Sequence, residues 1–338
     1  MNNSNLTCRI IGFGTHVPER ILTNADFTKT LDTSDEWIVT RTGISKRHVA
    51  AAGVTTSDLA LPAARQALSD AGIDAEDLTH ILFATCTPDA QCPISACGLA
   101  DKLGIKGAAA IDFNVGCCGF VNGLALARGM LHADPGAKIL LVAAERLTTR
   151  INMTDRATAV LFGDGAGAFV VTAAIEKPGA PRKGIRIVDV VLHSDGSLGE
   201  LLTVHGGGSI HPYQLGDAVG TEYFLYMNGR EVFKYAVRYM AQTSAEILER
   251  NGLTVADVDL VIPHQANQRI IEAVAKRLEA PAERVFSVVA DYGNTSAASI
   301  PLALGDARKQ GLIKPGIRML LPVFGGGFTW GAALLEVD

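Results

Sequence analysis

The chain has no long hydrophobic run, and this absence argues against a protein embedded in a membrane. None of its apolar stretches approaches the roughly 18 residues that a membrane-spanning helix needs. The first residues, MNNSNLTCR, also lack the apolar core of a secretory signal. Together these features predict a cytoplasmic protein that does not act in a membrane.

Cysteine is scarce and is not arranged for disulfides or for zinc. The chain has six cysteines without a Cys-x-x-Cys pair, and its eight histidines show no paired ligand spacing. We therefore expect a reduced protein with no metal centre. The net charge of −5 argues against general nucleic-acid binding, because the phosphate backbone attracts basic surfaces.

The sequence is rich in apolar residues and contains an internal repeat. Its 338 residues, 48% of them hydrophobic, predict a globular protein with two domains or halves. Residues 67–82 match residues 247–262 without a gap, so that Gly72 pairs with Gly252 and Asp77 with Asp257. Both stretches predict a helix, a glycine cap, a turn and a buried strand. We expect two copies of a βαβα unit, one in residues 1–175 and one in residues 176–338.

The elements that follow the repeat come in the same order in both copies. Each copy predicts a helix (93–103 and 267–279), a strand (109–113 and 285–289), a turn, a second helix, and a strand (139–142 and 319–321). Sites in α/β sheets form beyond the carboxyl ends of the strands. Turns at these ends carry Cys117 in the first copy and His264 and Asn294 in the second, so packing of the copies would bring the three together.

Cys117 and Cys118 lie in the turn between the strand that ends near Phe113 and a helix that begins near Gly119. A thiol at a helix N-terminus has a lowered pKa, because free N–H groups and the helix dipole stabilise the thiolate. Such a cysteine is a candidate nucleophile. The alternative is that both cysteines are small, inert core residues.

The other candidate residues each have an ordinary structural interpretation. His264 can hydrogen-bond a thiolate or a thioester oxygen, and Asn294 can donate from its amide, but Asn294 also suits an Asx turn. Residues 324–328 (FGGGF) can offer N–H groups to an oxyanion or form a tight apolar turn. Residues 163–167 (GDGAG) lack the Lys-Ser/Thr of a phosphate loop and predict close packing instead.

Taken together, these stretches resemble the β-ketoacyl-[acyl-carrier-protein] synthase III family of thiolase-fold condensing enzymes, over nearly the whole chain. The resemblance lies in residues 33–44 (TSDEWIVTRTGI), Cys117 with Gly119 and Phe120, and residues 162–168 (FGDGAGA), 264–267 (HQAN), 292–296 (YGNTS) and 324–331 (FGGGFTWG). It implies a five-layer α-β-α-β-α fold of two duplicated halves and a homodimer. It also implies the initiating condensation of type II fatty-acid synthesis, in which an acyl-CoA primer joins malonyl-[acyl carrier protein].

The resemblance assigns the chemistry residue by residue. Cys117 takes the acyl group, with Cys118 as the second candidate, while His264 and Asn294 hold the malonyl thioester during decarboxylation. N–H groups of Cys117 and Gly326 hold the tetrahedral oxyanion. Acyl-CoA is a substrate, and no resident cofactor is implied. Thiolases carry a second cysteine in the C-terminal glycine loop, where this chain has Phe324.

The resemblance also implies binding surfaces. Coenzyme A would contact Trp37, Arg41, Arg156, Gly229, Phe233, Ala266 and Asn267. An acidic acyl carrier protein would dock on Lys234, Arg269, Lys276 and Arg277, where residues 269 and 276 share a helix face. A solvated Arg over a half-buried Trp, and a solvated helix face, are the structural alternatives for these two sets.

Besides Cys118, where the family more often has Ala or Ser, two features depart from the family pattern. Cys92 replaces the Phe that often precedes Pro93 in acetyl-specific members, which predicts a roomier primer pocket that accepts primers beyond acetyl. Residues 205–211 (HGGGSIH) form an insertion-like stretch without a predicted role. A synthase or acyltransferase of secondary metabolism, and a non-catalytic partner subunit, remain as alternative functions.

Overall fold

The computed structural model describes residues 6–175 and 184–338. The first half contains β1 Leu6–His16, β2 Ile21–Thr23, α1 Asn24–Phe27, α2 Asp35–Thr42, β3 Lys46–His48, α3 Thr56–Ala71, β4 His80–Ala84, α4 Ser95–Leu103, β5 Ala109–Phe113, α5 Gly119–Ala133, β6 Lys138–Glu145, α6 Arg156–Ala159 and β7 Gly165–Ile175. The second half contains β8 Ile185–Ser194, β9 Leu202–Thr203, β10 Tyr226–Met227, α7 Gly229–Arg250, β11 Leu260–Val261, α8 Gln268–Leu278, α9 Val289–Tyr292, α10 Ser299–Lys309, β12 Arg318–Gly325 and β13 Thr329–Val337.

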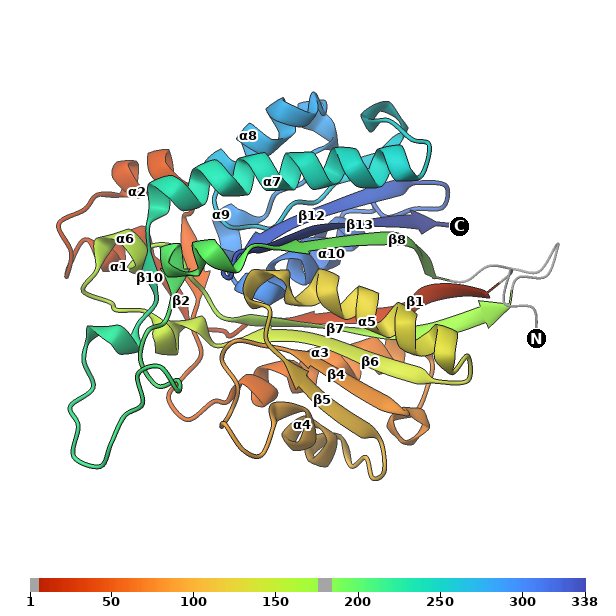
Figure 1. Ribbon diagram of the computed structural model, residues 1–338, viewed down its shortest axis with the longest axis horizontal. Coiled ribbons are helices and arrows are strands. Elements are labelled where there is room, and N and C mark those ends of the chain that lie inside the picture. The colour runs from red at the N-terminus through yellow and green to blue at the C-terminus, as the bar shows by residue number, and fades with distance from the viewer. Residues whose placement is uncertain (1–5, 176–183) are drawn as a thin grey trace.

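These elements stack in five layers (Figure 1). Helices α7 and α8 cover one outer face, α3 and α4 cover the other, and α5 and α10 lie between the two sets of strands. The strand order is β11-β12-β13-β8-β1-β7-β6-β4-β5, and the two sets join where Arg9 pairs with Arg186 and Ile10 with Ile185. The expected α-β-α-β-α architecture is confirmed.

The middle layer is apolar because it faces a sheet on both sides. On α5, Phe120, Val121, Leu124 and Leu131 are almost fully buried. Gly123 permits the close approach of this helix to β6, since a Cβ there would lie 2.3 Å from a methyl carbon of Leu141. The central core therefore fixes the start of α5, and with it the turn that carries the two adjacent cysteines.

The internal repeat is visible as structure. Gly72 is the C-cap of α3, and Gly252 follows Asn251, the C-cap of α7; their φ values are 68° and 67°. Single-turn helices, Ala75–Asp77 (η2) and Val255–Asp257 (η7), come next in both copies. Strand β4 pairs in parallel with β5 and β6, and β11 pairs in parallel with β12. The proposed division into residues 1–175 and 176–338 falls between β7 and β8.

The strand predicted at residues 285–289 is wrong. Val285 makes only an isolated bridge to Val261, and α9 begins at Val289. The Val288 N–H donates to the side-chain oxygen of Gln265 at 2.8 Å, so a side chain takes the backbone donor that a neighbouring strand would otherwise satisfy.

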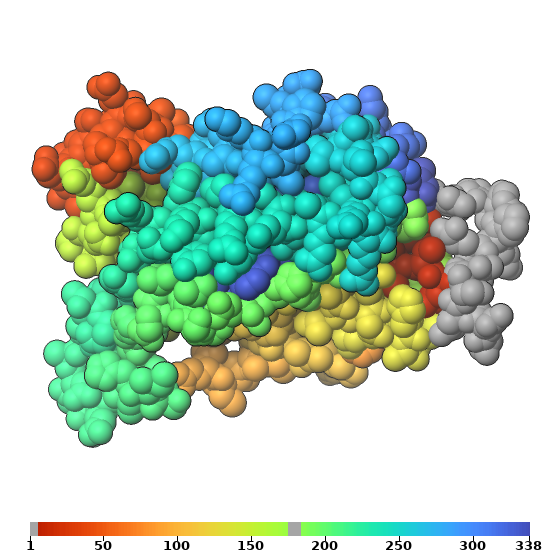
Figure 2. Space-filling view, turned by 45° about the horizontal axis from the view of Figure 1, so that its top comes forward, coloured from red at the N-terminus to blue at the C-terminus, as the bar shows by residue number. Residues whose placement is uncertain are grey.

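The segment between β9 and β10 projects from the body as a lobe (Figure 2). It includes the insertion-like residues 205–211, and the side chains of Ile210 and Leu215 at its surface are essentially fully exposed. The lobe contacts the loop after β4, where Gln91 Nε2 donates to the Gly207 carbonyl at 3.5 Å.

Candidate active site

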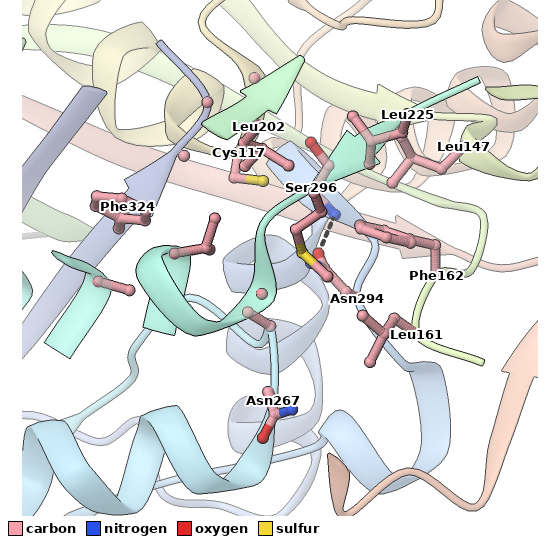
Figure 3. Close-up of a pocket in the computed structure, with 18 of the residues that line it drawn as sticks. Cys117, Leu147, Leu161, Phe162, Leu202, Leu225, Asn267, Asn294, Ser296 and Phe324 are labelled. Carbon is pink, nitrogen blue, oxygen red and sulfur yellow. Dashed lines mark hydrogen bonds between the residues drawn. The ribbon is translucent and has the colours of Figure 1, made fainter. Parts of the chain in front are cut away.

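A cavity of about 880 Å³ opens where strand ends of both halves meet. Cys117, His264 and Asn294 all line it, as predicted from their positions at strand ends. Figure 3 shows Cys117, Ser296 and Asn294 gathered at one place in the cavity, beside apolar side chains that include Leu147, Leu161, Phe162 and Leu225.

Cys117 lies in a single turn of helix, Gly116–Cys118 (η3), that leads directly into α5. Gly116 makes this turn possible because its φ is 50°, a left-handed value that suits glycine. The turn packs against the end of β12, since a Cβ on Gly325 would lie 3.0 Å from the Cys117 nitrogen. The backbone thus holds Cys117 between the two halves.

The expected lowering of the Cys117 pKa is wrong. Burial raises the pKa of the Cys117 thiol to about 11, although a hydrogen bond with the Ser296 hydroxyl lowers it; the Glu145 carboxylate raises it further. The helix N-terminus is present, but burial, which disfavours the thiolate, has the largest influence on this pKa. Cys117 is therefore a thiol at neutral pH and needs a group that accepts its proton.

Cys118 is oriented differently. Its Sγ donates to the Thr329 carbonyl at 3.2 Å, its side chain is fully buried, and burial raises its pKa. It does not line the cavity. Of the two adjacent cysteines, only Cys117 faces the space that a substrate can enter.

His264 follows β11 and is held as a neutral donor. Its Nδ1 lies 2.6 Å from Ser299 Oγ, and the Gln265 N–H also points to that oxygen at 3.4 Å. When Nδ1 accepts from the Ser299 hydroxyl, the neutral ring carries its proton on Nε2 and can donate it. Burial lowers the pKa of His264 to about 4, so the ring is uncharged at neutral pH.

Asn294 is oriented by its own turn. Its Oδ1 accepts from the Ser296 N–H at 2.9 Å, the bond drawn in Figure 3, and its backbone N–H donates to Leu161 at 2.8 Å. With the oxygen engaged, the Nδ2 group is the part of the amide available as a donor. The Asx turn that the sequence suggested as an alternative is present and serves to orient the amide.

The glycine turn after β12 also reaches the cavity. Gly326 lines it, and a Cβ on Gly116 would lie 3.7 Å from the Gly326 nitrogen. The backbone nitrogens of Cys117 and Gly326 thus belong to neighbouring turns, as an oxyanion-binding pair requires.

Six of the seven residues predicted for coenzyme A line the cavity. Trp37, Arg41, Gly229, Phe233, Ala266 and Asn267 line the cavity. Ser34 caps α2 as expected, accepting from the Trp37 N–H at 3.0 Å. Arg156 does not line the cavity, and its guanidinium lies 4.6 Å from the Trp37 ring centre. An adenine between them therefore requires the Arg156 side chain to move outward.

The remaining predicted residues lie on the surface. Lys234 is exposed on α7, and Arg269, Lys276 and Arg277 are exposed on α8; of these four, only Arg269 lines the cavity. Cys92 is exposed and does not line the cavity of its own chain. A role for Cys92 in the primer pocket therefore depends on a second copy of the chain.

Three polar residues near the site were missed by sequence reasoning. Glu145 ends β6, Ser296 follows Asn294, and Ser299 begins α10; all three are buried. The rule that sites form beyond strand ends applies to Glu145 and could have found it. Within the described residues, no three His, Cys, Asp or Glu side chains are placed to share a metal ion, and no helix is long and apolar enough to cross a membrane.

The fold and the arrangement of these groups place the chain among the thiolase-fold condensing enzymes. The model of the 3-oxoacyl-[acyl-carrier-protein] synthase III family matches residues 111–196, and that of its C-terminal part matches residues 248–337. The β-ketoacyl-[acyl-carrier-protein] synthase III of Nitratidesulfovibrio vulgaris (strain DP4) is 61% identical over 325 residues, covering 96% of this chain and 97% of its own.

Solved structures agree with this assignment. The β-ketoacyl-[acyl-carrier-protein] synthase III of Thermus thermophilus is 46% identical with a TM-score of 0.88, covering 98% of this chain and 99% of its own. The priming β-ketosynthase of the R1128 polyketide pathway is 34% identical with a TM-score of 0.87, covering 98% and 97%. The chain belongs to the β-ketoacyl-[acyl-carrier-protein] synthase III family of condensing acyltransferases.

Proposed function

We propose that this protein catalyses the initiating condensation of type II fatty-acid synthesis. An acyl-CoA primer would acylate Cys117, and malonyl-[acyl carrier protein] would then condense with it to give a 3-oxoacyl-[acyl carrier protein] and CO₂. The observation that carries the proposal is one cavity that presents a thiol together with two neutral donors, His264 and Asn294.

Neutral donors suit the second half of this reaction. Loss of CO₂ from the malonyl thioester leaves an enolate, whose oxygen gains charge and so gains most from the N–H groups of His264 and Asn294. The enolate carbon then attacks the Cys117 thioester. Backbone N–H groups of Cys117 and Gly326 would hold the resulting oxyanion until the thiolate leaves.

The binding surfaces follow from the same proposal. Coenzyme A would extend from Cys117 toward Trp37 and Arg41, and the carrier protein would dock on the exposed basic residues of α7 and α8. A cytoplasmic homodimer is part of the proposal, in which Cys92 of one copy bounds the primer pocket of the other.

A priming role in secondary metabolism is the second candidate. The 34% identity with the R1128 priming β-ketosynthase over 98% of this chain favours it. The apolar side chains around Cys117 in Figure 3 also suit a primer longer than acetyl. The primer preference and the carrier protein that is used distinguish the two candidates.

The test is the intact mass of the protein after incubation with a panel of acyl-CoAs, followed by malonyl-[acyl carrier protein]. We expect an acyl adduct on the wild type, its absence in Cys117→Ala, and its discharge by the malonyl donor. An adduct that persists in Cys117→Ala would contradict the assigned nucleophile. Use of acetyl-CoA alone would contradict the roomier pocket, and the absence of any adduct would favour a carrier-bound donor or a non-catalytic subunit.

A further inference from the structure

Glu145 is a carboxylate with no exposed surface, and it contacts Cys86 and Ser296, which line the active-site cavity. Its oxygens accept from Thr87 Oγ1 at 2.6 Å, Thr85 Oγ1 at 3.1 Å and the Cys86 N–H at 3.1 Å. The titratable groups that face it are the thiols of Cys86 and Cys117. Burying a charge costs free energy, and an apolar side chain at this position would avoid that cost. The cluster of donors therefore stabilises an acidic side chain here.

Ser296 connects Glu145 to the nucleophile. Its Oγ donates to Glu145 Oε1 at 3.1 Å, and the same hydroxyl lies close enough to the Cys117 thiol to lower the pKa of that thiol. The residue belongs to a single helical turn, Ser296–Ala298 (η9), that packs against the turn of Cys117. The Ser296 hydroxyl is therefore near both the Cys117 thiol and the Glu145 carboxylate.

The backbone of Ser296 is held in an unfavourable conformation. Its φ is 51°, in the left-handed region that costs a residue with a side chain about 1 kcal/mol or more. Gly116, at the equivalent position of the first copy, has a φ of 50° and avoids this cost. A serine where glycine would be more stable indicates that its hydroxyl has a use.

His264 is poorly placed to accept the thiol proton. Its Nδ1 is engaged by Ser299, and burial holds its pKa near 4, so that it acts as a neutral donor. Burial raises the pKa of Glu145, which makes this carboxylate a better proton acceptor than an exposed one. A proton on Glu145 also removes the repulsion between its charge and a Cys117 thiolate.

We propose that Ser296 and Glu145 form a proton relay for Cys117. As Sγ attacks the acyl donor, the thiol proton passes to Ser296 Oγ while the Ser296 proton passes to Glu145, which becomes a carboxylic acid. In the acylation of the proposed function, the C–S bond to coenzyme A breaks and the departing thiolate takes a proton from solvent. When condensation later releases the Cys117 thiolate, the relay returns the proton from Glu145.

The test is the rate of Cys117 alkylation by iodoacetamide between pH 6 and 10, measured by the mass of the peptide that contains Cys117, because Cys92 and Cys97 are also free and exposed. This reagent needs no acyl donor or carrier protein, so the relay can fail while the proposed function stands, and the reverse. We expect Ser296→Ala to slow alkylation at pH 7 about tenfold or more and to move the rise of the pH profile upward. Thr295→Val is the control, because the neighbouring Thr295 hydroxyl is buried without a hydrogen-bond partner among the described residues.

Glu145→Gln separates a relay from a purely electrostatic effect. Removing a negative charge near Cys117 would by itself favour the thiolate and speed alkylation, whereas loss of the proton acceptor slows it. We expect slower alkylation in Glu145→Gln, and a Ser296→Ala/Glu145→Gln double variant no slower than the slower single variant, because both act on one path. Alkylation in Glu145→Gln as fast as in the wild type would overturn the relay.

The Ser296→Gly variant tests whether slower alkylation is caused by loss of folding. Glycine relieves the left-handed strain, so we expect its thermal midpoint to equal or exceed that of the wild type while alkylation remains about tenfold slower or more. If Ser296→Gly alkylated at the wild-type rate, the hydroxyl would have no part in proton transfer and the relay would be wrong.

Discussion

The two turns that meet at the active site are copies of one structure with different side chains. Asn114 Oδ1 accepts from the Gly116 N–H at 3.1 Å, and Asn294 Oδ1 accepts from the Ser296 N–H at 2.9 Å. A single helical turn and then a long helix follow in each case, from Gly119 in the first copy and from Ser299 in the second. The backbone of the repeat was kept while its chemistry diverged.

Because of this divergence, the two copies provide different chemical groups to the site. The first turn provides the thiol, on Cys117, where the second has Ala297. The second provides the groups that orient partners, since Ser299 contacts His264 and Ser296 contacts Glu145. In the proposed reaction, two equivalent turns thus separate the reacting atom from the residues that position and polarise.

Substitution of the paired asparagines should have the largest effect on activity. Asn294 is 7% exposed and lines the cavity, and we expect Asn294→Ala to lower the condensation rate about 100-fold or more, because one donor to the enolate is lost. Asn114 also lines the cavity but is exposed and is not a donor to the enolate in the proposed reaction, so Asn114→Ala, which removes the same turn hydrogen bond, should change the rate less than about threefold. Both are measured as steady-state kcat/KM for malonyl-[acyl carrier protein]; equal losses would contradict the division between the copies.

Residues 119 and 299 begin equivalent helices. We expect a substitution at residue 119 to change mainly stability and one at residue 299 to change mainly the condensation rate. A Cβ on Gly119 would lie 2.8 Å from Ala84 Cβ, so Gly119→Ala should lower the free energy of unfolding by about 1–3 kcal/mol. Ser299→Ala fits its site but removes the partner of His264 Nδ1, and should slow condensation about tenfold while acylation by acyl-CoA is unchanged. Denaturant unfolding and single-turnover rates measure the two effects, and slower acylation in Ser299→Ala would argue against its role through His264.

The fold and the presence of Cys117, His264 and Asn294 in one cavity could be predicted because they depend on local pattern and chain order. The repeat fixes which strands are parallel, and the carboxyl ends of strands then gather Cys117, His264 and Asn294. Ser296 and Glu145 could not be connected in this way, because they are 151 residues apart and meet only through packing of the two copies. The Cys117 pKa was predicted with the wrong sign for the same reason: the helix end is local, whereas burial is tertiary.

His264 should make stability depend on pH, unlike Ala84 at the equivalent position. Its folded pKa of about 4 lies below the unfolded value near 6.5, so the unfolded chain binds a proton more readily between these values. Stability is therefore full above about pH 6.5 and falls as the pH decreases toward 4, by about 3 kcal/mol from this residue. The free energy of unfolding of wild type minus His264→Gln, followed from pH 7 to 4, measures the effect; a flat difference would contradict it.

The smallest effect tests whether the two copies unfold together. Gly72 and Gly252 have matching left-handed φ, and a Cβ on either would meet no atom within 4 Å, so each Gly→Ala change costs only backbone strain, about 1 kcal/mol. Because α5 and α10 share one central core with strands of both halves, we expect one denaturant transition, shifted equally by either variant. Two transitions, each moved by only one variant, would show instead that the halves are independently stable domains held together by their surfaces.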